Sequence, residues 1–363
     1  MNPSSNGKKP TILDIAKALG ISTATVSRAL HNNQNVTEET KARVLQMAKK
    51  IGFKPNLAAR YLSSKRQLRI SVNKLKGTTS FWNEVRGGIE EERKSHDLRN
   101  VEIEYRTYSD LGDGEIAAFE SAMEAGVDGI ITFPSNQDSM RPLMRWAARS
   151  KTPVVYVATD APGTDRLTVV SIDTFASGAL AADLMGRIVR NPGKLAVTLF
   201  DAHITEHAEK FAAFQDTIKK FYPNLSVLDP IEDRGTDTIS YERTRRLLQE
   251  TPDICGIYVT TELSMPVIRA ARDTETLDKL TIISTDLFPQ LVEQIRNGCV
   301  AATIYQRPRT QGRMAFRTLY AYLVDGERAT RQTTFAPHVV MRGNLDFFLK
   351  RVAAESRDKS KIL

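Results

Sequence analysis

The 363-residue chain has only two cysteines and no long hydrophobic run. Cys255 and Cys299 lie far apart, without histidines at the spacing of a metal site, so we expect two reduced thiols and assign them no function. No segment reaches the roughly 18 to 20 consecutive apolar residues that span a bilayer, and the start of the chain lacks the apolar stretch of a secretory signal. These absences predict a cytoplasmic protein.

The chain also lacks the common signatures of nucleotide binding and catalysis. It contains no G-x-x-x-x-G-K-[ST] loop, and no G-x-G-x-x-G follows a strand-like segment. No pairing of a nucleophile with a base stands out either. We therefore predict no enzymatic activity, no cofactor and no metal site. The 41% of apolar residues suffices to bury a small domain and a two-lobed core, which excludes a chain disordered throughout.

Basic charge is concentrated in the N-terminal part of the chain. Residues 1–66 hold 12 Lys or Arg against 3 Asp or Glu, which gives a net charge of +9. Because the whole chain carries +8, the remainder carries −1. A strongly basic segment on a near-neutral body indicates a polyanionic partner at one end of the protein.

The segment at 11–30, TILDIAKALGISTATVSRAL, has the pattern of two short helices joined by a glycine turn. Its apolar residues recur at helical spacing, Gly20 suits the left-handed turn that ends a helix, and Ser22 suits the cap of the next helix. Val26 and Leu30 then face the interior, which leaves small and polar residues outside. The pattern predicts a helix-turn-helix that enters a major groove, with an ordinary helical hairpin as the alternative.

Two further segments extend this domain. A third helix is predicted to start after Val36, with Thr37 at its beginning, and to complete a three-helix core. Residues 55–64, PNLAARYLSS, are compatible with a helix but have too small an apolar face to be stable alone. We expect this segment to become ordered only with help from a partner.

These residues resemble the LacI/GalR-type transcriptional repressors, and weaker matches extend the resemblance over nearly the whole chain. The matching residues are Thr11, Ile12, Asp14, Ile15, Ala16, Gly20, Ile21, Ser22, Thr25, Val26, Ser27, Arg28, Val36, Thr40, Arg43, Val44, Ala48, Gly52, Phe53, Pro55, Asn56, Ala59, Arg60 and Leu62. The resemblance implies an all-α helix-turn-helix headpiece with a hinge helix, followed by a two-lobed α/β core like the type I periplasmic sugar-binding proteins. It also implies a homodimer on double-stranded operator DNA.

The resemblance assigns DNA-contacting roles to particular positions. The residues at base-reading positions are Thr23, Ala24 and Arg28. The residues at phosphate-contacting positions are Ser22, Thr25, Ser27 and Asn35. The residues at minor-groove hinge positions are Asn56, Ala59 and Leu62. Arg28 is best able to specify a base, since a guanidinium pairs in bidentate fashion with guanine. Leu62 matches a leucine that is wedged between bases and kinks the DNA, although a plain linker leucine is the alternative.

From residue 68 onward, strand-like and helical segments alternate, which is typical of parallel sheets covered on both faces. The predicted domains are a headpiece at 1–54, a hinge helix and linker at 55–67, a core at 68–350 and a polar tail at 351–363. Within the core, the N-lobe is predicted at 68–168 plus 300–330 and the C-lobe at 169–299 plus 331–350. The tail has no sustained apolar heptad, so we expect a dimer and no tetramerising coiled coil.

Ligands of such sheets bind beyond the carboxyl ends of the strands, here in the cleft between the lobes. The polar residues at predicted strand ends are Asp160, Asp173, Thr260, Glu262, Asp286 and Gln306. Their carboxylate, hydroxyl and amide groups suit a polyhydroxylated effector, although helix capping is the alternative for each acidic residue. By resemblance, Lys210 replaces an arginine that clamps the ligand in many relatives. His203, Glu206 and His207 precede it and are further candidates for lining the cleft.

The sequence thus predicts a sequence-specific transcriptional repressor that binds a palindromic operator as a homodimer under control of a sugar-like small molecule. One alternative is a repressor of the same fold controlled by a protein partner or a phosphorylated metabolite. Another is a sugar-binding transport component, which the core alone would support. The basic N-terminal segment and the lack of a secretory signal argue against that alternative.

Overall fold

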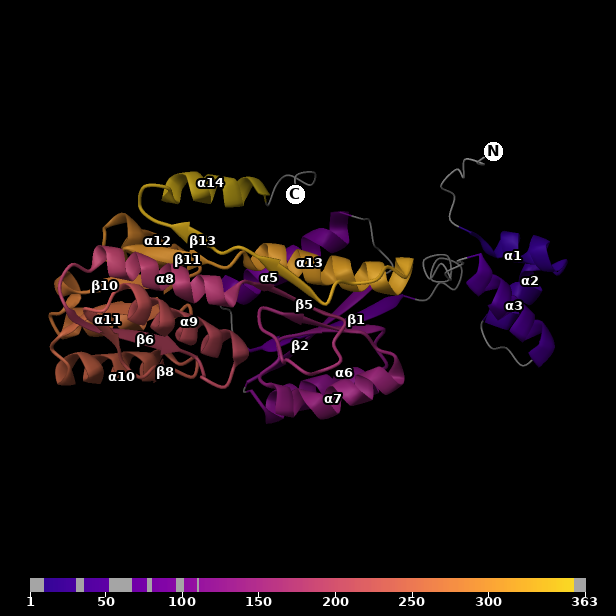
Figure 1. Cartoon of the computed structure of the whole chain (residues 1–363), viewed down its shortest axis with the longest axis horizontal. Helices are drawn as coiled ribbons and strands as arrows, with labels where there is room; N and C mark the ends of the chain where they lie inside the picture. The colour runs from indigo at the N-terminus through magenta and orange to yellow at the C-terminus, as the bar shows by residue number, and fades with distance from the viewer. Residues whose placement is uncertain are drawn as a thin grey trace. The chain divides into compact units, whose positions relative to one another are not determined.

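The computed structural model describes residues 10–30, 36–51, 67–76, 80–95, 101–109 and 111–355 (Figure 1). The chain separates into two compact units, an N-terminal headpiece and a larger core. Each unit encloses its own cluster of buried apolar side chains. Among the helices described, none combines the length and the apolar character needed to cross a membrane.

The headpiece consists of three helices, α1 (Ile12–Leu19), α2 (Thr23–Leu30) and α3 (Glu38–Lys50). Helix α1 ends at Gly20, whose φ of 67° lies in the left-handed region. The Ser22 hydroxyl accepts a hydrogen bond from the Thr25 amide at 3.0 Å, and Thr37 caps α3 in the same way. The helices share a core of Ile15, Ala16, Val26, Ala29, Val44 and Ala48. The predicted helix-turn-helix with a third helix is therefore confirmed.

The N-lobe of the core is a parallel sheet in the order β12-β5-β4-β3-β1-β2. Its strands are β1 (Leu68–Leu75), β2 (Val101–Tyr108), β3 (Gly129–Thr132), β4 (Val154–Val157), β5 (Thr168–Ile172) and β12 (Gln332–Phe335). One face of the sheet is covered by α6 (Asp113–Glu124) and α7 (Gln137–Ser150). The other face is covered by α5 (Ser80–Ser95) and α13 (Pro308–Tyr320), as Figure 1 shows.

The C-lobe contains a second sheet in the order β13-β11-β10-β9-β6-β7, with β8 paired to β6 and with β13 antiparallel to its neighbour. Its strands are β6 (Gly193–Leu199), β7 (Leu225–Val227), β8 (Ile231–Glu232), β9 (Ile254–Val259), β10 (Thr281–Thr285), β11 (Ala302–Tyr305) and β13 (His338–Val340). Helices α8 (Thr174–Ile188) and α9 (Thr205–Phe221) pack together on one face. The predicted α/β core of mostly parallel sheets is confirmed.

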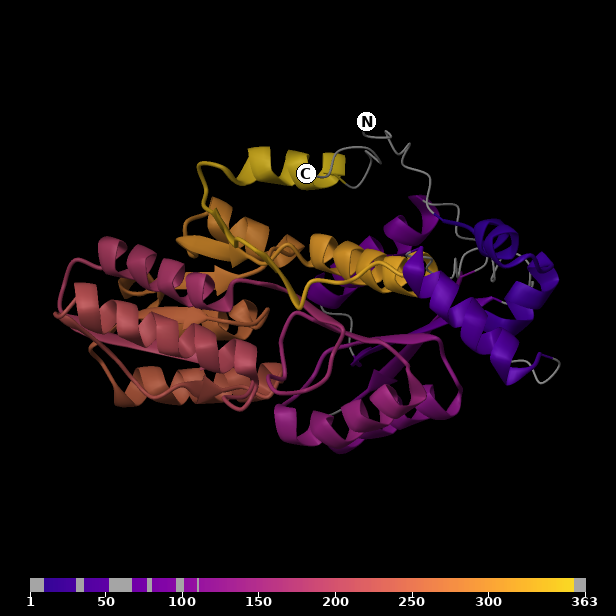
Figure 2. The same ribbon diagram turned by 45° about the vertical axis from the view of Figure 1, so that its right-hand side comes forward.

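The other face of the C-lobe sheet is covered by α10 (Asp237–Glu250), α11 (Ser264–Asp273) and α12 (Pro289–Arg296), with a short 3-10 helix at Leu277–Lys279. The last helix, α14 (Leu345–Glu355), lies beside α12 in both views (Figures 1 and 2). Arg296 of α12 and Asp346 of α14 form an ion pair at 3.0 Å. A π-helical turn at Ala321–Asp325 follows α13.

Both lobes repeat one strand order. In each sheet the first five strands in sequence are arranged 2-1-3-4-5, if the short β8 is set aside, and one further strand is added at the edge beside the fifth. This order reverses direction between the first and third strands, which opens a crevice at their carboxyl ends. The carboxyl ends of the strands in both sheets therefore form equivalent crevices in which a ligand can bind.

The sheets correct the predicted lobe boundaries. Strand β5 and strand β12 belong to the N-lobe sheet, whereas β11 belongs to the C-lobe sheet. The chain crosses between lobes after β5, after β11 and after β12, because each strand stays with the sheet whose hydrogen bonds it completes. The predicted polar tail begins too early, since α14 continues to Glu355. The predicted hinge and linker at 55–67 lies almost entirely outside the described residues.

Helices α5 and α13 cross in direct backbone contact. A Cβ atom built on Gly88 would lie 2.0 Å from the carbonyl oxygen of Arg309, and one built on Gly312 would lie 2.0 Å from that of Val85. Glycine at both positions removes the side-chain layer that normally separates packed helices by 8 to 10 Å. The N-lobe therefore holds these two helices as a tightly joined pair.

Candidate functional site: DNA-reading helix and inter-lobe cavity

Helix α2 presents the predicted base-reading residues to solvent. Thr23, Ala24 and Arg28 are exposed, whereas Val26 and Ala29 are buried against α1 and α3. The exposed residues lie at the N-terminal end of the helix and one turn further on, which suits a helix that enters a major groove end-on. The geometry thus leaves these three side chains available to a base edge.

The predicted phosphate-contacting residues have mixed surroundings. The Ser22 and Thr25 hydroxyls are hydrogen bonded to each other at 2.8 Å, and Ser27 is half-buried on α2. Ser22 therefore has a helix-capping role before any role toward DNA. Asn35, Asn56, Ala59 and Leu62 lie outside the described residues.

A cavity of about 240 Å³ lies at the carboxyl ends of the strands, between the two lobes. We call it the inter-lobe cavity. The lining residues that directly follow a strand are Lys76, Ser109, Phe133, Ala158, Phe200, Thr260, Asp286 and Gln306. The rule that ligands bind beyond strand ends therefore identifies the correct edge of each sheet. Of the seven predicted effector-binding residues, Thr260, Glu262, Asp286 and Gln306 line this cavity.

A buried network of charged and amide groups forms one wall of the inter-lobe cavity. The Lys210 ammonium, which has no exposed surface, donates to Glu206 and, at 2.7 Å, to Gln306. The Gln306 side-chain amide in turn donates to Asp286 at 2.7 Å. Lys210 itself does not line the cavity, so it holds Glu206 and Gln306 in place from behind.

Burial shapes the protonation states of this network. Burial alone would lower the pKa of Lys210, but attraction to Glu206 and Asp286 outweighs it, and the pKa lies above its usual value. Burial raises the pKa of Asp286 to about 6, although hydrogen bonds from Gln306 act in the opposite direction. Lys210 therefore remains a cation at neutral pH, and Glu206 and Asp286 offset its positive charge.

His207 is a neutral member of the same wall. Burial lowers the pKa of this imidazole to about 4, so at neutral pH it carries no charge. Its Nδ1 atom is hydrogen bonded to the Thr260 hydroxyl at 3.0 Å, and its ring stacks on Phe200 with the planes 17° apart. The pair His207 and Thr260 thus offers hydrogen bonds without charge.

Glu262 has a role that the sequence did not predict. Its carboxylate accepts hydrogen bonds from the backbone amides of Ser80, at 2.9 Å, and of Phe81. Glu262 follows β9 of the C-lobe, whereas these amides begin α5 of the N-lobe, so the carboxylate caps a helix of the opposite lobe. A second bond between lobes joins the Glu206 amide to the Thr159 hydroxyl at 3.1 Å.

Besides Lys210, two predicted effector-binding residues lie outside the lining of the inter-lobe cavity. Asp160 and Asp173 line a neighbouring cavity of about 660 Å³, which shares Ala158 and Glu206 with the first. Asp160 pairs with Arg166 through two bonds of 2.6 Å, and Asp173 caps α8 by accepting from the Ala176 amide at 2.8 Å. Ion pairing and helix capping thus already use these two carboxylates, and their effector-binding role stays a prediction.

Aromatic residues also line the inter-lobe cavity, but the prediction from sequence included only polar residues at strand ends. Trp82 makes edge-to-face contacts with Phe81, at 5.2 Å between ring centroids, and with Phe133, at 5.4 Å. Phe200 lies on the opposite lobe. Phe133 and Phe200 directly follow strands, so the same strand-end rule would have found them if aromatic residues had been considered.

A further cluster of polar side chains lies near the inter-lobe cavity. Ligand atoms of Asp201, His203 and Glu232 lie within 4.8 Å of one another. The Arg234 guanidinium forms ion pairs with both Asp201 and Glu232, so a cation already bridges the two carboxylates. His203 thus lies with this ion pair rather than with Glu206 and His207.

Comparisons with known proteins agree with this architecture. Residues 11–56 match the family described as bacterial regulatory proteins, lacI family, and residues 71–328 match the family described as periplasmic binding protein domain. A catabolite control protein A from Priestia megaterium is 28% identical over 72% of this chain and 77% of its own length. One from Staphylococcus aureus is 24% identical over 90% of this chain and 96% of its own length.

The core also has the same fold as several solved structures. A glucose-galactose binding protein from Geobacillus stearothermophilus superimposes with a TM-score of 0.72 at 22% identity, covering 77% of this chain and 99% of that protein. A solute binding protein from Agrobacterium vitis superimposes with a TM-score of 0.73 at 16% identity, covering 78% of this chain and 98% of that protein. The chain therefore belongs to the family of the periplasmic binding protein domain, which matches most of its length, and it carries an N-terminal DNA-binding domain of the lacI family of bacterial regulatory proteins.

Proposed function

We propose that the protein is a sequence-specific transcriptional repressor that binds a palindromic operator as a homodimer and responds to a sugar or polyol in the inter-lobe cavity. One observation carries the proposal: a single chain joins a lacI-family DNA-binding domain to a cavity of about 240 Å³ between two lobes. Relatives named catabolite control protein A support a regulatory role connected with catabolism.

On DNA, the exposed side chains of α2 read the operator in the major groove. Arg28 specifies guanine, with Thr23 and Ala24 beside it, and Ser22, Thr25, Ser27 and Asn35 contact phosphates that fix the register. Asn56, Ala59 and Leu62 act in the minor groove at the operator centre. Two copies related by a twofold axis read the two halves of the palindrome, and the protein acts in the cytoplasm, where the operator is.

The chemistry of the inter-lobe cavity favours an uncharged polyhydroxylated effector. Aromatic rings such as Trp82 suit the C–H face of a sugar ring, whereas Asp286, Gln306 and the His207–Thr260 pair supply directed hydrogen bonds. Lys210 is already paired with Glu206, and Arg234 with Asp201 and Glu232. A phosphorylated metabolite, the alternative effector, would have to rely on Lys76, which lines the cavity at the end of β1.

The test is thermal unfolding of the full chain against a panel of monosaccharides, disaccharides, polyols and sugar acids. A ligand present at about 100 times its dissociation constant adds roughly 2.7 kcal/mol of stability, so a selective rise in Tm identifies the effector class. Trp82→Leu is expected to weaken that ligand by about tenfold, whereas Trp146→Leu, on α7 outside the cavity lining, leaves binding unchanged. No rise across the panel would favour control by a protein partner.

The DNA-reading role of α2 is tested with Arg28→Ala in a binding assay on operator and on random DNA. Loss of a bidentate guanine contact costs about 1 to 3 kcal/mol on the operator alone. Lys17→Ala, an exposed cation on α1, serves as the control and is expected to lower affinity for both DNAs equally. Equal losses on both DNAs for Arg28→Ala would refute its assignment as a base reader.

A further inference from the structure

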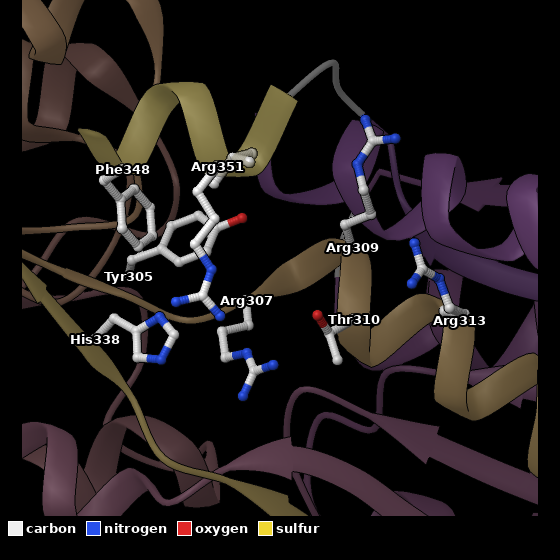
Figure 3. A pocket seen from close by; sticks show the side chains of 9 residues that line it. Tyr305, Arg307, Arg309, Thr310, Arg313, His338, Phe348 and Arg351 are labelled. Atoms are coloured by element: carbon white, nitrogen blue, oxygen red, sulfur yellow. The ribbon is translucent and has the colours of Figure 1, made fainter. Parts of the chain in front are cut away.

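A second pocket lies away from the inter-lobe cavity, where β11 passes into α13. Its walls come from the end of β11, the first turns of α13, β13 and α14, which are all parts of the core. Figure 3 shows the side chains of Arg307, Arg351 and His338 on one side of this pocket and those of Arg309 and Arg313 on the other. We call it the arginine pocket.

The lining of the arginine pocket is strongly basic. It contains four arginines and one histidine, and none of its lining residues is Asp or Glu. Arg309 and Arg313 pair with Glu84 and Glu91 of α5, which lie outside the lining. These two arginines are held toward α5 and their charge is offset by Glu84 and Glu91, so the net positive charge of the pocket does not come from them.

Arg307 and Arg351 bring charge to the pocket from two different elements. The Arg307 guanidinium lies over the Phe335 ring, 5.1 Å from its centroid, and among the described residues it is in no ion pair. Arg351 is an exposed residue of α14 whose guanidinium points toward Arg307 in Figure 3. Arg307 and Arg351 thus approach one space from two elements, where a phosphate group lies within reach of both guanidinium groups.

The backbone at the start of α13 adds donors to the same place. Arg307 has a φ of 58° and a ψ of 47°, in the left-handed region that non-glycine residues rarely occupy. Pro308 follows it as the first residue of the 13-residue helix, and Thr310 lines the pocket with its hydroxyl. The helix dipole and the amides of its first turn also favour an anion. Backbone strain of this kind clusters at functional sites.

We infer that the arginine pocket is a binding site for a phosphate group, held between Arg307 and Arg351 and oriented by Thr310 and His338. Guanidinium forks match the geometry of phosphate oxygens and form strong charge-assisted hydrogen bonds with them. The enclosed volume of about 20 Å³ has room for little more than one water molecule, so only a small group such as phosphate enters, and the exposed Arg351 side chain has to move aside for it. The ligand is therefore inorganic phosphate, or a metabolite that inserts its phosphate and leaves its remaining atoms outside.

The position of this site gives it a regulatory consequence. Arg307 is joined by one peptide bond to Gln306, whose side chain belongs to the inter-lobe cavity network. The Gln311 side-chain amide donates to the Gln306 carbonyl at 2.8 Å, which ties the first turn of α13 to that residue. We expect phosphate bound at Arg307 to act on effector binding through these contacts, without entering the inter-lobe cavity.

The experiment titrates the full chain, without sugar, with inorganic phosphate and with glycerol 3-phosphate, using ³¹P NMR and thermal unfolding. Glycerol and potassium chloride at matched ionic strength are the probes without a phosphate group. The test variant is Arg307→Gln/Arg351→Gln. The control variant is Arg187→Gln/Arg246→Gln, which removes equal charge from two exposed arginines on α8 and α10.

Wild-type protein and the control variant are expected to bind at least one phosphate probe, and the test variant is expected to bind it about tenfold more weakly or less. Binding of inorganic phosphate alone identifies the free ion as the ligand, and tighter binding of glycerol 3-phosphate identifies a metabolite phosphate. Equal affinity of the test and control variants would overturn the inference, as would a response to chloride of the same size. The outcome is independent of the sugar panel, since no sugar is present.

Discussion

Three residues with unusual backbone conformations surround the inter-lobe cavity. Ala158, Arg234 and Asp286 have φ values of 71°, 52° and 61°, and each lies within two residues of a strand end. Non-glycine residues adopt this region at a cost of about 1 kcal/mol or more, so the surrounding hydrogen bonds must hold it. For Asp286, those bonds come from the Gln306 backbone amide at 3.1 Å and its side-chain amide at 2.7 Å.

At the residue scale, Lys210 is expected to be the most sensitive position of the cavity wall. Lys210→Met leaves Glu206 buried without its cation, so unfolding in urea should show a loss of about 3 to 5 kcal/mol. The double variant Glu206→Gln/Lys210→Met removes both charges and is expected to lose less than Lys210→Met alone. If Lys210→Met were as stable as wild type, the buried charge of Glu206 would not depend on Lys210.

Asp233 provides a pH-dependent signature, because burial raises its pKa to about 6 despite hydrogen bonds from Gly235 and Thr261. In the unfolded chain the same carboxyl ionises near 3.9. Between about pH 4 and 6 the folded state therefore holds more protons, and the contribution of Asp233 to the free energy of unfolding falls as pH rises. Measured against Asp233→Asn across this range, wild-type stability should decline, and parallel curves would contradict the shifted pKa.

At the scale of elements, the pair α5 and α13 depends on its glycines. Gly312→Ala would place a Cβ atom 2.0 Å from the Val85 carbonyl oxygen, a backbone atom that no rotamer change can move away. We expect a loss of about 1 to 3 kcal/mol or more from overpacking, measured as a lower denaturation midpoint. Gly343→Ala is the matched control, since a Cβ atom there has no neighbour within 4 Å. Equal midpoints for the two variants would mean that the helices separate easily.

The elements also show what sequence patterns can and cannot predict. Periodicity and capping signals located the headpiece helices, because Gly20, Ser22 and Thr37 act through local bonds. Asp173 caps α8 through a local bond of the same kind, whereas the role of Glu262 depends on where α5 begins in space, which no local pattern encodes. Short strands such as β12 gain their identity only by pairing with a distant strand. The lobe boundaries were therefore harder to predict than the elements themselves.

At the scale of the whole core, Glu262 joins the two lobes at the inter-lobe cavity. Glu262→Gln keeps the shape of the side chain but removes the charge that α5 attracts at its N-terminus. Without ligand, we expect a larger radius of gyration by small-angle X-ray scattering. We also expect effector affinity to be about fivefold weaker, because the arrangement in which Glu262 caps α5 loses about 1 kcal/mol. Glu250→Gln, on exposed α10, is the control. Unchanged scattering and affinity would exclude a role of Glu262 in closure.

The close contact of α5 and α13 has a consequence for how a signal travels. Gln306 lies at the cavity, α13 starts two residues later, and Gly88 and Gly312 leave no compressible layer between α13 and α5. Helix α5 follows β1, which is the first strand after the predicted hinge. We expect a displacement of Gln306 to move α13 and α5 together as one rigid body. The movement then reaches β1, the first strand of the core, because α5 follows β1 in the chain.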